Sequence, residues 1–414
     1  MNTALDRPWR PLLAETHALR ARAIVDDIRV ALRHAGKDEP SLYEGWAGRA
    51  LFFDAVTRFG DDEREMTARC LDRAAEQLAL APSGAYFFGG FSGVAWAAEL
   101  LEPDGEDGNG DIDDALLQLL SRPWTATYDL VAGLVGLGIY ALGRAHRPSG
   151  RACAARIVEL LAERVEPRAG GCSWRTDPAW LSPTNRLRHG GGHYNLGVAH
   201  GVPGVIVFLA GACAAGIAVD RARPLLDGAV HWLWSVRLPE DSPSLFDYQQ
   251  RDDAAPTPAR LAWCYGDPGV AAALAAAALA VDEPLWLERA VAAGLRASRR
   301  TDDGGVRDAG LCHGSAGVAL LFHRLWQASG CTELADAARR WYAHTIDQCR
   351  PGTGVAGYRS YQPQWESRPA HWRDDAAFLT GSCGIGLALL AGLGVEPTWD
   401  RALAASLPTY ARRG

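Results

Sequence analysis

The feature that most constrains the fold of this chain is a Gly-x-x-Gly signature that leads into an apolar stretch at seven points. The seven copies are Gly45–Gly48, Gly90–Gly93, Gly133–Gly136, Gly201–Gly204, Gly266–Gly269, Gly314–Gly317 and Gly381–Gly384. Successive first glycines are separated by 45, 43, 68, 65, 48 and 67 residues. Because a two-helix repeat takes about 45 residues, the pattern predicts seven helical hairpins, with about 20 additional residues in each of the three longer intervals.

The segments that follow the signatures have the composition of buried helices. Residues 270–281 are almost entirely Ala and Leu, and residues 318–322 are all apolar, as expected inside a protein. The segments between them, such as 61–80 and 332–348, are amphipathic and fit an outer layer. A parallel sheet would need β-branched strands before each helix, and the chain has few of them. We therefore expect an all-α fold, an α/α toroid (barrel) of seven helical hairpins with inner and outer helix rings and every signature loop at one end.

We expect this toroid to be a single domain that extends over residues 1–414. Two regions depart from the repeat. Residues 167–193 are rich in Gly, Pro, Arg and Trp and predict a long loop near the signature end. Residues 238–258 carry Pro, Asp and Gln with little periodicity and predict a small insertion, in which residues 244–248 have the composition of a short strand.

Composition and charge exclude several classes of protein. The 414 residues are 48% hydrophobic and 22% charged, which is typical of a globular chain, and the net charge of −7 gives no basic footprint for nucleic acid. Residues 1–10 lack the apolar segment of a secretory signal, so we expect a cytoplasmic location. Val202–Val219 is uncharged over 18 residues, but Pro203 and three glycines interrupt it, so we expect a buried helix and no integral membrane segment. Nine irregularly spaced cysteines do not predict a disulfide framework.

Three signature copies carry conspicuous polar residues directly before their glycines. If all seven loops lie at one end of a toroid, these side chains converge on one mouth. Cys264 and Cys312 each lie two residues before a first glycine, and His313 follows Cys312. Two thiolates and one imidazole suit Zn²⁺ and leave a fourth position open, as in catalytic zinc sites. The alternative is that both cysteines are small buried residues near helix starts.

His200 precedes its glycine directly, in the same position that His313 occupies in the sixth copy. Such a histidine is either a hydrogen-bonded structural residue or an acid–base catalyst. Asp129 lies four residues before the third first glycine and either caps a helix or orients His200. Arg260 forms a surface salt bridge or faces the mouth, and Tyr265 either packs or joins the site.

The sequence Trp-Cys-Tyr-Gly, preceded by Ala-His-Gly and followed 48 residues after its cysteine by the Cys-His-Gly copy, resembles the lanthipeptide cyclase (LanC) family of lanthionine-forming enzymes. The resemblance covers residues 41–390 and implies the same seven-hairpin toroid. By position it implies zinc ligands at Cys264, Cys312 and His313, and active-site residues at His200, Asp129, Arg260 and Tyr265.

The family's reaction adds a Cys thiol of a ribosomally made precursor peptide to a dehydroalanine or dehydrobutyrine of the same peptide and closes a thioether ring. The resemblance implies Zn²⁺ as cofactor, a dehydrated precursor peptide as substrate and a lanthipeptide dehydratase as a candidate partner. In this mechanism His200 protonates the α-carbon, Arg260 or His200 stabilises the enolate, and Asp129 orients His200.

Other functions fit parts of the pattern. A LanC-like enzyme that adds glutathione to dehydroamino acids shares the fold, and a zinc-binding scaffold of a peptide-modification complex retains the ligands. Lys37 is the only lysine, which suggests a GC-rich bacterial genome and favours the cyclase. Toroidal protein prenyltransferases use an Asp, Cys and His ligand set, and toroidal glycosidases need two carboxylates facing across the cavity, of which we find only Asp129.

Overall fold

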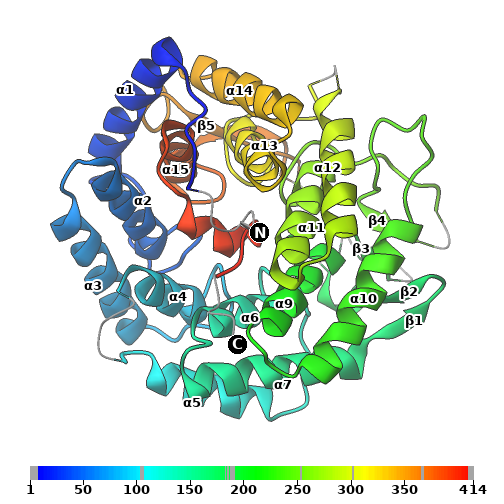
Figure 1. Cartoon of the computed structure of the whole chain (residues 1–414). Helices are drawn as coiled ribbons and strands as arrows, with labels where there is room; N and C mark the ends of the chain where they lie inside the picture. The colour runs from blue at the N-terminus through cyan, green and yellow to red at the C-terminus, as the bar shows by residue number, and fades with distance from the viewer. Residues whose placement is uncertain are drawn as a thin grey trace.

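The structure is a computed structural model that describes residues 8–102, 107–181, 183, 186, 192–251, 254–300, 303–364 and 368–408. Its helices alternate between two concentric rings (Figure 1). The inner ring comprises α2 (Trp46–Phe59), α4 (Phe91–Leu101), α6 (Leu134–Gly143), α9 (Val202–Ala214), α11 (Asp267–Val281), α13 (Ser315–Ser329) and α15 (Ser382–Leu393). The outer ring comprises α1 (Glu15–Leu32), α3 (Arg64–Leu80), α5 (Gly110–Leu120), α7 (Pro148–Arg164), α10 (Val219–Ser235), α12 (Pro284–Ser298) and α14 (Thr332–Asp347). The predicted α/α toroid is confirmed.

The ring closes because the first helix packs beside the last. α15 contacts both α1 and α2, so α1 serves as the outer helix of the seventh hairpin. The two rings differ in how they bury their residues. In α11 every residue from Asp267 to Ala278 is buried, whereas in α14 the buried residues Leu334, Ala338, Tyr342 and Ile346 recur every four positions along one face.

Each inner helix begins directly after the first glycine of a signature. The second glycine is required for a separate reason, which is the close approach of the loop backbone. A Cβ on Gly317 would lie 1.9 Å from the carbonyl oxygen of Leu311, and one on Gly93 would lie 1.8 Å from that of Phe87. In all seven copies the nearest atom is the carbonyl oxygen six residues earlier. The repeated signature therefore reflects a loop that folds back tightly against the first turn of its helix.

The three longer intervals contain the short strands. The first holds β1 (Glu166–Arg168), β2 (Gly171–Ser173), the 3-10 helix η2 (Pro178–Trp180) and β3 (Tyr194–Asn195); the second holds β4 (Gln249–Gln250); the third holds β5 (Arg359–Gln362) and β6 (His371–Asp374). β1 pairs with β2, β3 with β4 and β5 with β6, all antiparallel. The additional residues expected in the three longer intervals therefore form short strands and loops that lie outside the two helical rings.

The expectation of a strand at residues 244–248 is wrong. The strand of the predicted insertion is β4, and residues 252–253 of that insertion lie outside the described residues. The carboxylate of Asp267 accepts the backbone N–H groups of Leu245 (2.7 Å) and Phe246 (3.0 Å). Because the Asp267 carboxylate already accepts these two backbone N–H groups, they cannot donate hydrogen bonds to a neighbouring β-strand.

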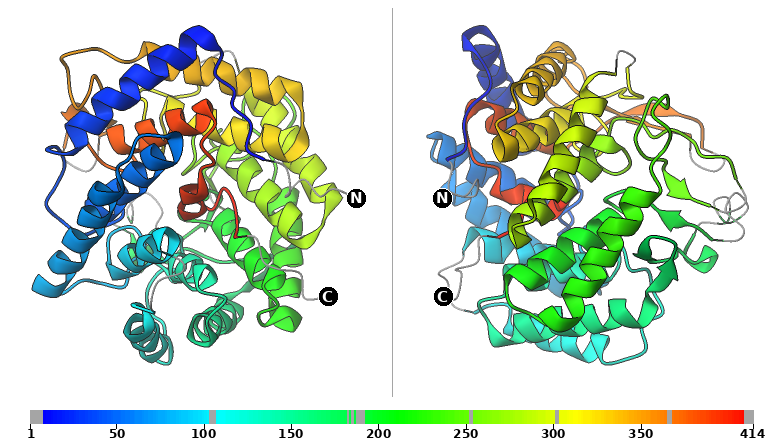
Figure 2. Two further views of the ribbon diagram at one scale, coloured as in Figure 1. Left: turned by 60° about the vertical axis from the view of Figure 1, so that its left-hand side comes forward. Right: turned by 45° about the vertical axis from the view of Figure 1, so that its right-hand side comes forward.

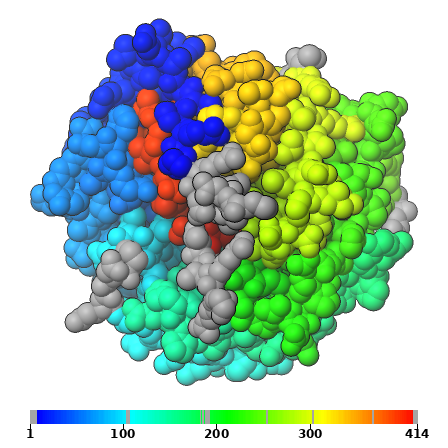
Figure 3. Space-filling view, in the orientation of Figure 1, coloured from blue at the N-terminus to red at the C-terminus, as the bar shows by residue number. Residues whose placement is uncertain are grey.

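The centre of the toroid is filled by aromatic side chains and by the 3-10 helix η3 (Thr398–Leu403), which lies at the end opposite to the short strands (Figure 2). In the space-filling view of that end, red atoms from the C-terminal part of the chain lie between blue N-terminal and yellow segments (Figure 3). Trp263 Nε1 donates to the carbonyl of Leu403 (2.6 Å), and the ring of Phe88 lies 6.0 Å from that of Trp263 and 6.5 Å from that of Phe378. Because Trp263, Phe88 and Phe378 belong to signature loops, their packing against one another and against η3 holds these loops in place.

The uncharged stretch that begins at Val202 forms α9, whose residues from Val202 to Ala212 are buried within the toroid. The prediction of a buried core helix is confirmed. Across the described ranges, no helix is at once long enough and apolar enough to cross a bilayer.

Candidate metal centre and catalytic residues

Backbone hydrogen bonds join six of the seven neighbouring pairs of signature loops around the mouth of the toroid, and none joins the fourth and fifth loops among the described residues. The bonds run from Tyr43 N to Phe88 O (2.9 Å), Phe88 N to Val131 O (3.4 Å), Leu130 N to Ala199 O (3.2 Å), Cys264 N to Cys312 O (3.2 Å), Cys312 N to Leu379 O (2.8 Å) and Phe378 N to Tyr43 O (2.8 Å). In every pair the accepting residue lies two positions before a first glycine. Side chains one and two positions before the glycines therefore occupy equivalent places around one mouth.

Cys264, Cys312 and His313 come together at this mouth. Their possible ligand atoms all lie within 4.8 Å of one another, and Cys264 is only 5% exposed. Both ring nitrogens of His313 are buried and have no hydrogen-bond partner among the described residues. A buried imidazole with two unsatisfied nitrogens is unfavourable unless another group binds it. Two thiols and an imidazole at this separation fit the donor set of a zinc site with one open position.

The pKa values of the two thiols are shifted in opposite directions. A hydrogen bond from the Cys312 thiol, helped by the nearby charges of Arg260 and His313 and opposed by burial, holds the pKa of Cys264 well below its usual range. The same hydrogen bond, together with burial, raises the pKa of Cys312. Arg260 Nη2 donates to Cys264 Sγ over 3.5 Å. The centre therefore favours one thiolate, which is the protonation state nearest to that of a metal ligand.

His200 and Asp129 are hydrogen-bonded to each other. His200 Nδ1 lies 2.7 Å from Asp129 Oδ2, and Asp129 Oδ1 accepts the backbone N–H of Ala132 (2.8 Å). Gly133 is the N-cap residue of α6 and no side chain caps this helix, so Asp129 is not its cap. Burial lowers the pKa of His200, but the hydrogen bond to Asp129 and the charges of Asp129 and Cys264 outweigh it and raise the pKa above its usual value. The His200 side chain is 40% exposed, and its Nε2 has no hydrogen-bond partner among the described residues.

Tyr265 and Arg260 complete the set predicted from the sequence. The Tyr265 ring faces that of His200 at an interplanar angle of 28° with centroids 6.1 Å apart, and its hydroxyl accepts from Asn195 Nδ2 (3.0 Å). Burial raises the pKa of Tyr265, so its own proton is retained and is free to be donated. Arg260 is half-buried with its Nε unbonded within the described part of the chain, and its guanidinium points to Cys264. It is therefore not a surface salt bridge.

Two contacts of these residues were missed by reasoning from the sequence. Asn195 fixes Tyr265, and the Tyr248 hydroxyl accepts the backbone N–H of Arg260 (3.2 Å). Asn195 and Tyr248 come from β3 and the segment before β4, where no repeat gives a register. The pairing of these two strands is the feature that brings them to the mouth.

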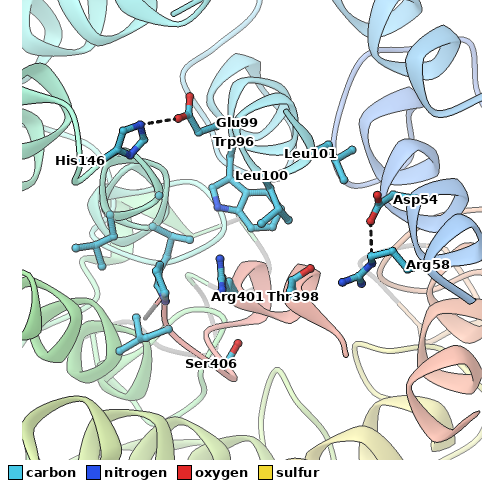
Figure 4. A pocket seen from close by; sticks show the side chains of 15 residues that line it. Asp54, Arg58, Trp96, Glu99, Leu100, Leu101, His146, Thr398, Arg401 and Ser406 are labelled. Carbon is cyan, nitrogen blue, oxygen red and sulfur yellow. Dashed lines mark ion pairs between the residues drawn. The ribbon is translucent and has the colours of Figure 1, made fainter. Parts of the chain in front are cut away.

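A cavity lies at the η3 end of the toroid, between α2, α4, α6 and the C-terminal segment (Figure 4). Its volume is about 440 Å³, and Trp96 and several leucines form much of its wall. Two pairs of its titratable groups contact each other: Asp54 lies 3.2 Å from Arg58, and Glu99 lies 3.2 Å from His146. Cys264, Cys312 and His313 are not among the residues that line it.

Comparisons with known proteins agree with the fold. The family model described as lanthionine synthetase C-like protein matches residues 36–403. The solved structure of nisin cyclase aligns with a TM-score of 0.69 and 17% sequence identity, covering 95% of this chain and 98% of that chain. A sugar epimerase from a ruminal bacterium aligns with a TM-score of 0.50 and 13% identity, covering 92% of this chain and 98% of the other.

Proposed function

Because this chain belongs to the lanthionine synthetase C-like family, we propose that it is a zinc-dependent lanthipeptide cyclase. It adds Cys thiols of a dehydrated precursor peptide to dehydroalanine or dehydrobutyrine residues of the same peptide, so that thioether rings form. The observation that carries this proposal is the convergence of Cys264, Cys312 and His313 beside the hydrogen-bonded pair of His200 and Asp129. These residues supply both a thiolate-stabilising centre and a proton donor at one mouth.

Cys264, Cys312 and His313 are the residues that would hold Zn²⁺. A Zn²⁺ ion held by them would lower the pKa of a nearby substrate thiol, which is otherwise only a few per cent ionised at pH 7 with a pKa of about 8.5. The chain itself adds positive charge beside the sulfur atoms, because the Arg260 guanidinium lies 3.5 Å from Cys264 Sγ. Negative charge that develops on the substrate near this point is therefore stabilised by Arg260.

The addition forms a bond from sulfur to the β-carbon and moves the electron pair of the double bond toward the α-carbon and its carbonyl. In this proposal Tyr265 donates to the resulting enolate oxygen. The support is that its own oxygen already accepts from Asn195 and that its proton has no other acceptor among the described contacts. His200, protonated and held through Nδ1 by Asp129, delivers a proton from Nε2 to the α-carbon. The thiol releases one proton, and this proton replaces the one that His200 gives to the α-carbon. The reaction is therefore balanced without another reactant.

The proposed partners follow from this chemistry. The substrate is a peptide that already contains dehydroamino acids, so a dehydratase must act before this chain, and we propose that the two enzymes work in one cytoplasmic pathway. The net charge of −7 gives no reason to expect nucleic acid as a partner.

The direct test uses zinc-loaded protein and a synthetic peptide with one Cys and one dehydroalanine. Cyclisation leaves the peptide mass unchanged and removes the free thiol, which alkylation followed by mass spectrometry detects. We expect His200→Asn to slow ring formation by about 10²- to 10⁴-fold, the usual contribution of a general acid. His231→Asn, which replaces an exposed histidine on α10, is the matched control. Near-normal activity of His200→Asn would refute the proton-donor role.

The same assay separates the alternatives. With glutathione present in excess, a glutathione-adding enzyme gives a peptide whose mass increases by one glutathione, whereas a cyclase gives the ring. A protein that binds zinc and peptide but does neither is a scaffold. Only ring formation supports the proposed function.

A further inference from the structure

The register of the signature loops places two further polar residues at the mouth. Tyr43 lies two residues before its first glycine, as Cys264 and Cys312 do, and Thr380 lies one residue before its own, as His313 does. The backbone bonds from Cys312 N to Leu379 O and from Phe378 N to Tyr43 O hold the sixth, seventh and first loops side by side. These two residues therefore flank the metal centre on the side away from His200.

Tyr43 and Thr380 belong to a hydrogen-bonded chain that ends on a buried carboxylate. Thr380 Oγ1 donates to Asp375 Oδ2 (2.7 Å), and the Tyr43 hydroxyl lies 3.4 Å from Thr380 Oγ1. Asp375 is itself fixed, because its Oδ1 accepts the backbone N–H of Ala377 (3.0 Å) and its Oδ2 accepts from Arg373 (3.0 Å). The arrangement parallels the Asp129 and His200 pair on the other side of the mouth.

The direction of these bonds determines what Tyr43 offers to a substrate. Thr380 has one hydroxyl proton, which it gives to Asp375, so it can only accept from Tyr43. The Tyr43 oxygen then has lone pairs but no proton for another group. Tyr265 is the opposite case, since its oxygen accepts from Asn195 and its proton is free. The two tyrosines therefore present complementary hydrogen-bonding groups.

The solvent exposure of these residues is consistent with Tyr43 as the group that contacts a substrate. Tyr43 is half-buried, whereas Thr380 is 7% and Asp375 is 6% exposed. The neighbouring carboxylate of Glu44 is paired with Lys37 and with Arg373 Nη2 (3.0 Å), so its charge is already balanced. Tyr43 is thus a neutral acceptor held at the rim.

We propose that the Tyr43 hydroxyl oxygen accepts a backbone N–H of the peptide bound over the metal centre, and that Thr380 and Asp375 position it. This inference rests on the proposed function, because it assumes a peptide substrate. Tyr43 fixes the position of the bound peptide while the thiol of the peptide reacts with the dehydroamino acid. Thr380 is a positioning residue, because it orients the Tyr43 hydroxyl.

The test compares Tyr43→Phe with the wild type, using Tyr86→Phe, which removes a hydroxyl from a 52% exposed tyrosine, as the matched control. Loss of one neutral hydrogen bond weakens binding by about 3- to 10-fold. We expect KM for the peptide to rise by that factor with kcat nearly unchanged, and zinc content and Tm to stay at wild-type values. Thr380→Val should give a smaller rise in KM, and the double variant should be no worse than Tyr43→Phe alone.

An unchanged KM in Tyr43→Phe overturns the inference, and so does a loss that appears only together with lost zinc or a lowered Tm. Peptide binding measured by fluorescence anisotropy keeps the inference separate from the proposed function. If the wild type binds the dehydrated peptide but does not cyclise it, the function fails, while a weaker Kd of Tyr43→Phe still supports the contact. Equal Kd values for the two proteins would refute it.

Discussion

Replacing Asp129 by Asn tests the link between the carboxylate and the proposed acid. Asp129 accepts two hydrogen bonds with different oxygens, one from His200 Nδ1 (2.7 Å) and one from Ala132 N (2.8 Å). Asparagine has only one acceptor oxygen, so Asp129→Asn must leave one of the two donors unpaired or turn its amide toward it. The negative charge that stabilises protonated His200 is lost in either case.

The size of this effect follows from the geometry. A hydrogen bond to a charged group contributes about 1.5–3 kcal/mol, and because His200 is 40% exposed we take about half of that, near 1 kcal/mol or about fivefold, for the protonated ring. Misorientation of Nε2 adds to this loss, so we expect kcat to fall by about 10- to 100-fold at neutral pH. The alkaline limb of the kcat profile should also shift to lower pH, because the His200 pKa is raised by Asp129.

Stability gives an independent readout of the same pair. The folded-state pKa of His200 lies above its unfolded value, so the pair's contribution to stability is complete below the unfolded pKa of about 6.5 and is lost as pH rises through the folded pKa. The difference in Tm between wild type and Asp129→Asn should therefore be largest below about pH 6 and should shrink in alkaline buffer.

The assay is single-turnover ring formation across the pH range, with Asp303→Asn as the control. Asp303 also accepts one backbone N–H, from Gly305 (2.8 Å), and lies on the surface, so its replacement removes a carboxylate without touching His200. An alkaline limb at the same pH in Asp129→Asn and the wild type would refute the reasoning, whatever happens to the absolute rate.

Three further outcomes are expected. Cys312→Ala should lose the bound zinc, as measured by inductively coupled plasma mass spectrometry on folded protein, and retention of a full equivalent would contradict the ligand assignment. Gly317→Ala should lower the free energy of unfolding by about 1–3 kcal/mol in a denaturant titration, because its Cβ meets the carbonyl oxygen of Leu311 at 1.9 Å, whereas Gly108→Ala, which has open space, should change it little. Arg260→Gln should lower kcat by about 10²-fold with unchanged zinc, and a rate within twofold of the wild type would remove Arg260 from the charge-stabilising role.

The fold could be predicted from the sequence because its main constraint is local. The second glycine of each signature meets a carbonyl only six residues away, so the same short motif is required wherever an inner helix begins. Counting from the signature glycines is also sufficient to predict that Cys264, Cys312 and His200 share one mouth. Apolar composition then separates inner from outer helices, as α11 and α14 show.

What could not be predicted depends on contacts between distant segments. Trp263 meets Leu403 across 140 residues, and nothing near either residue indicates this bond. The strand expected at 244–248 is absent because Asp267, on a different element, takes the backbone donors. Asn195 and Tyr248 reach the mouth only because β3 pairs with β4. In each case the tertiary arrangement of distant segments, and not the local sequence pattern, determines which residues come into contact.

The closed ring also explains how one mouth can hold groups of such different charge. Every inner helix begins at a signature glycine, so seven helix N-termini with their partial positive charge face the signature end. Such a field favours the thiolate at Cys264, and it disfavours protonation of His200. Asp129 offsets that last effect by direct contact, which is why the His200 pKa is raised despite burial. A chain that kept Cys264, Cys312 and His313 but lost Asp129 should therefore have a lower His200 pKa, and under the proposed mechanism it would lack the protonated imidazole that completes the addition.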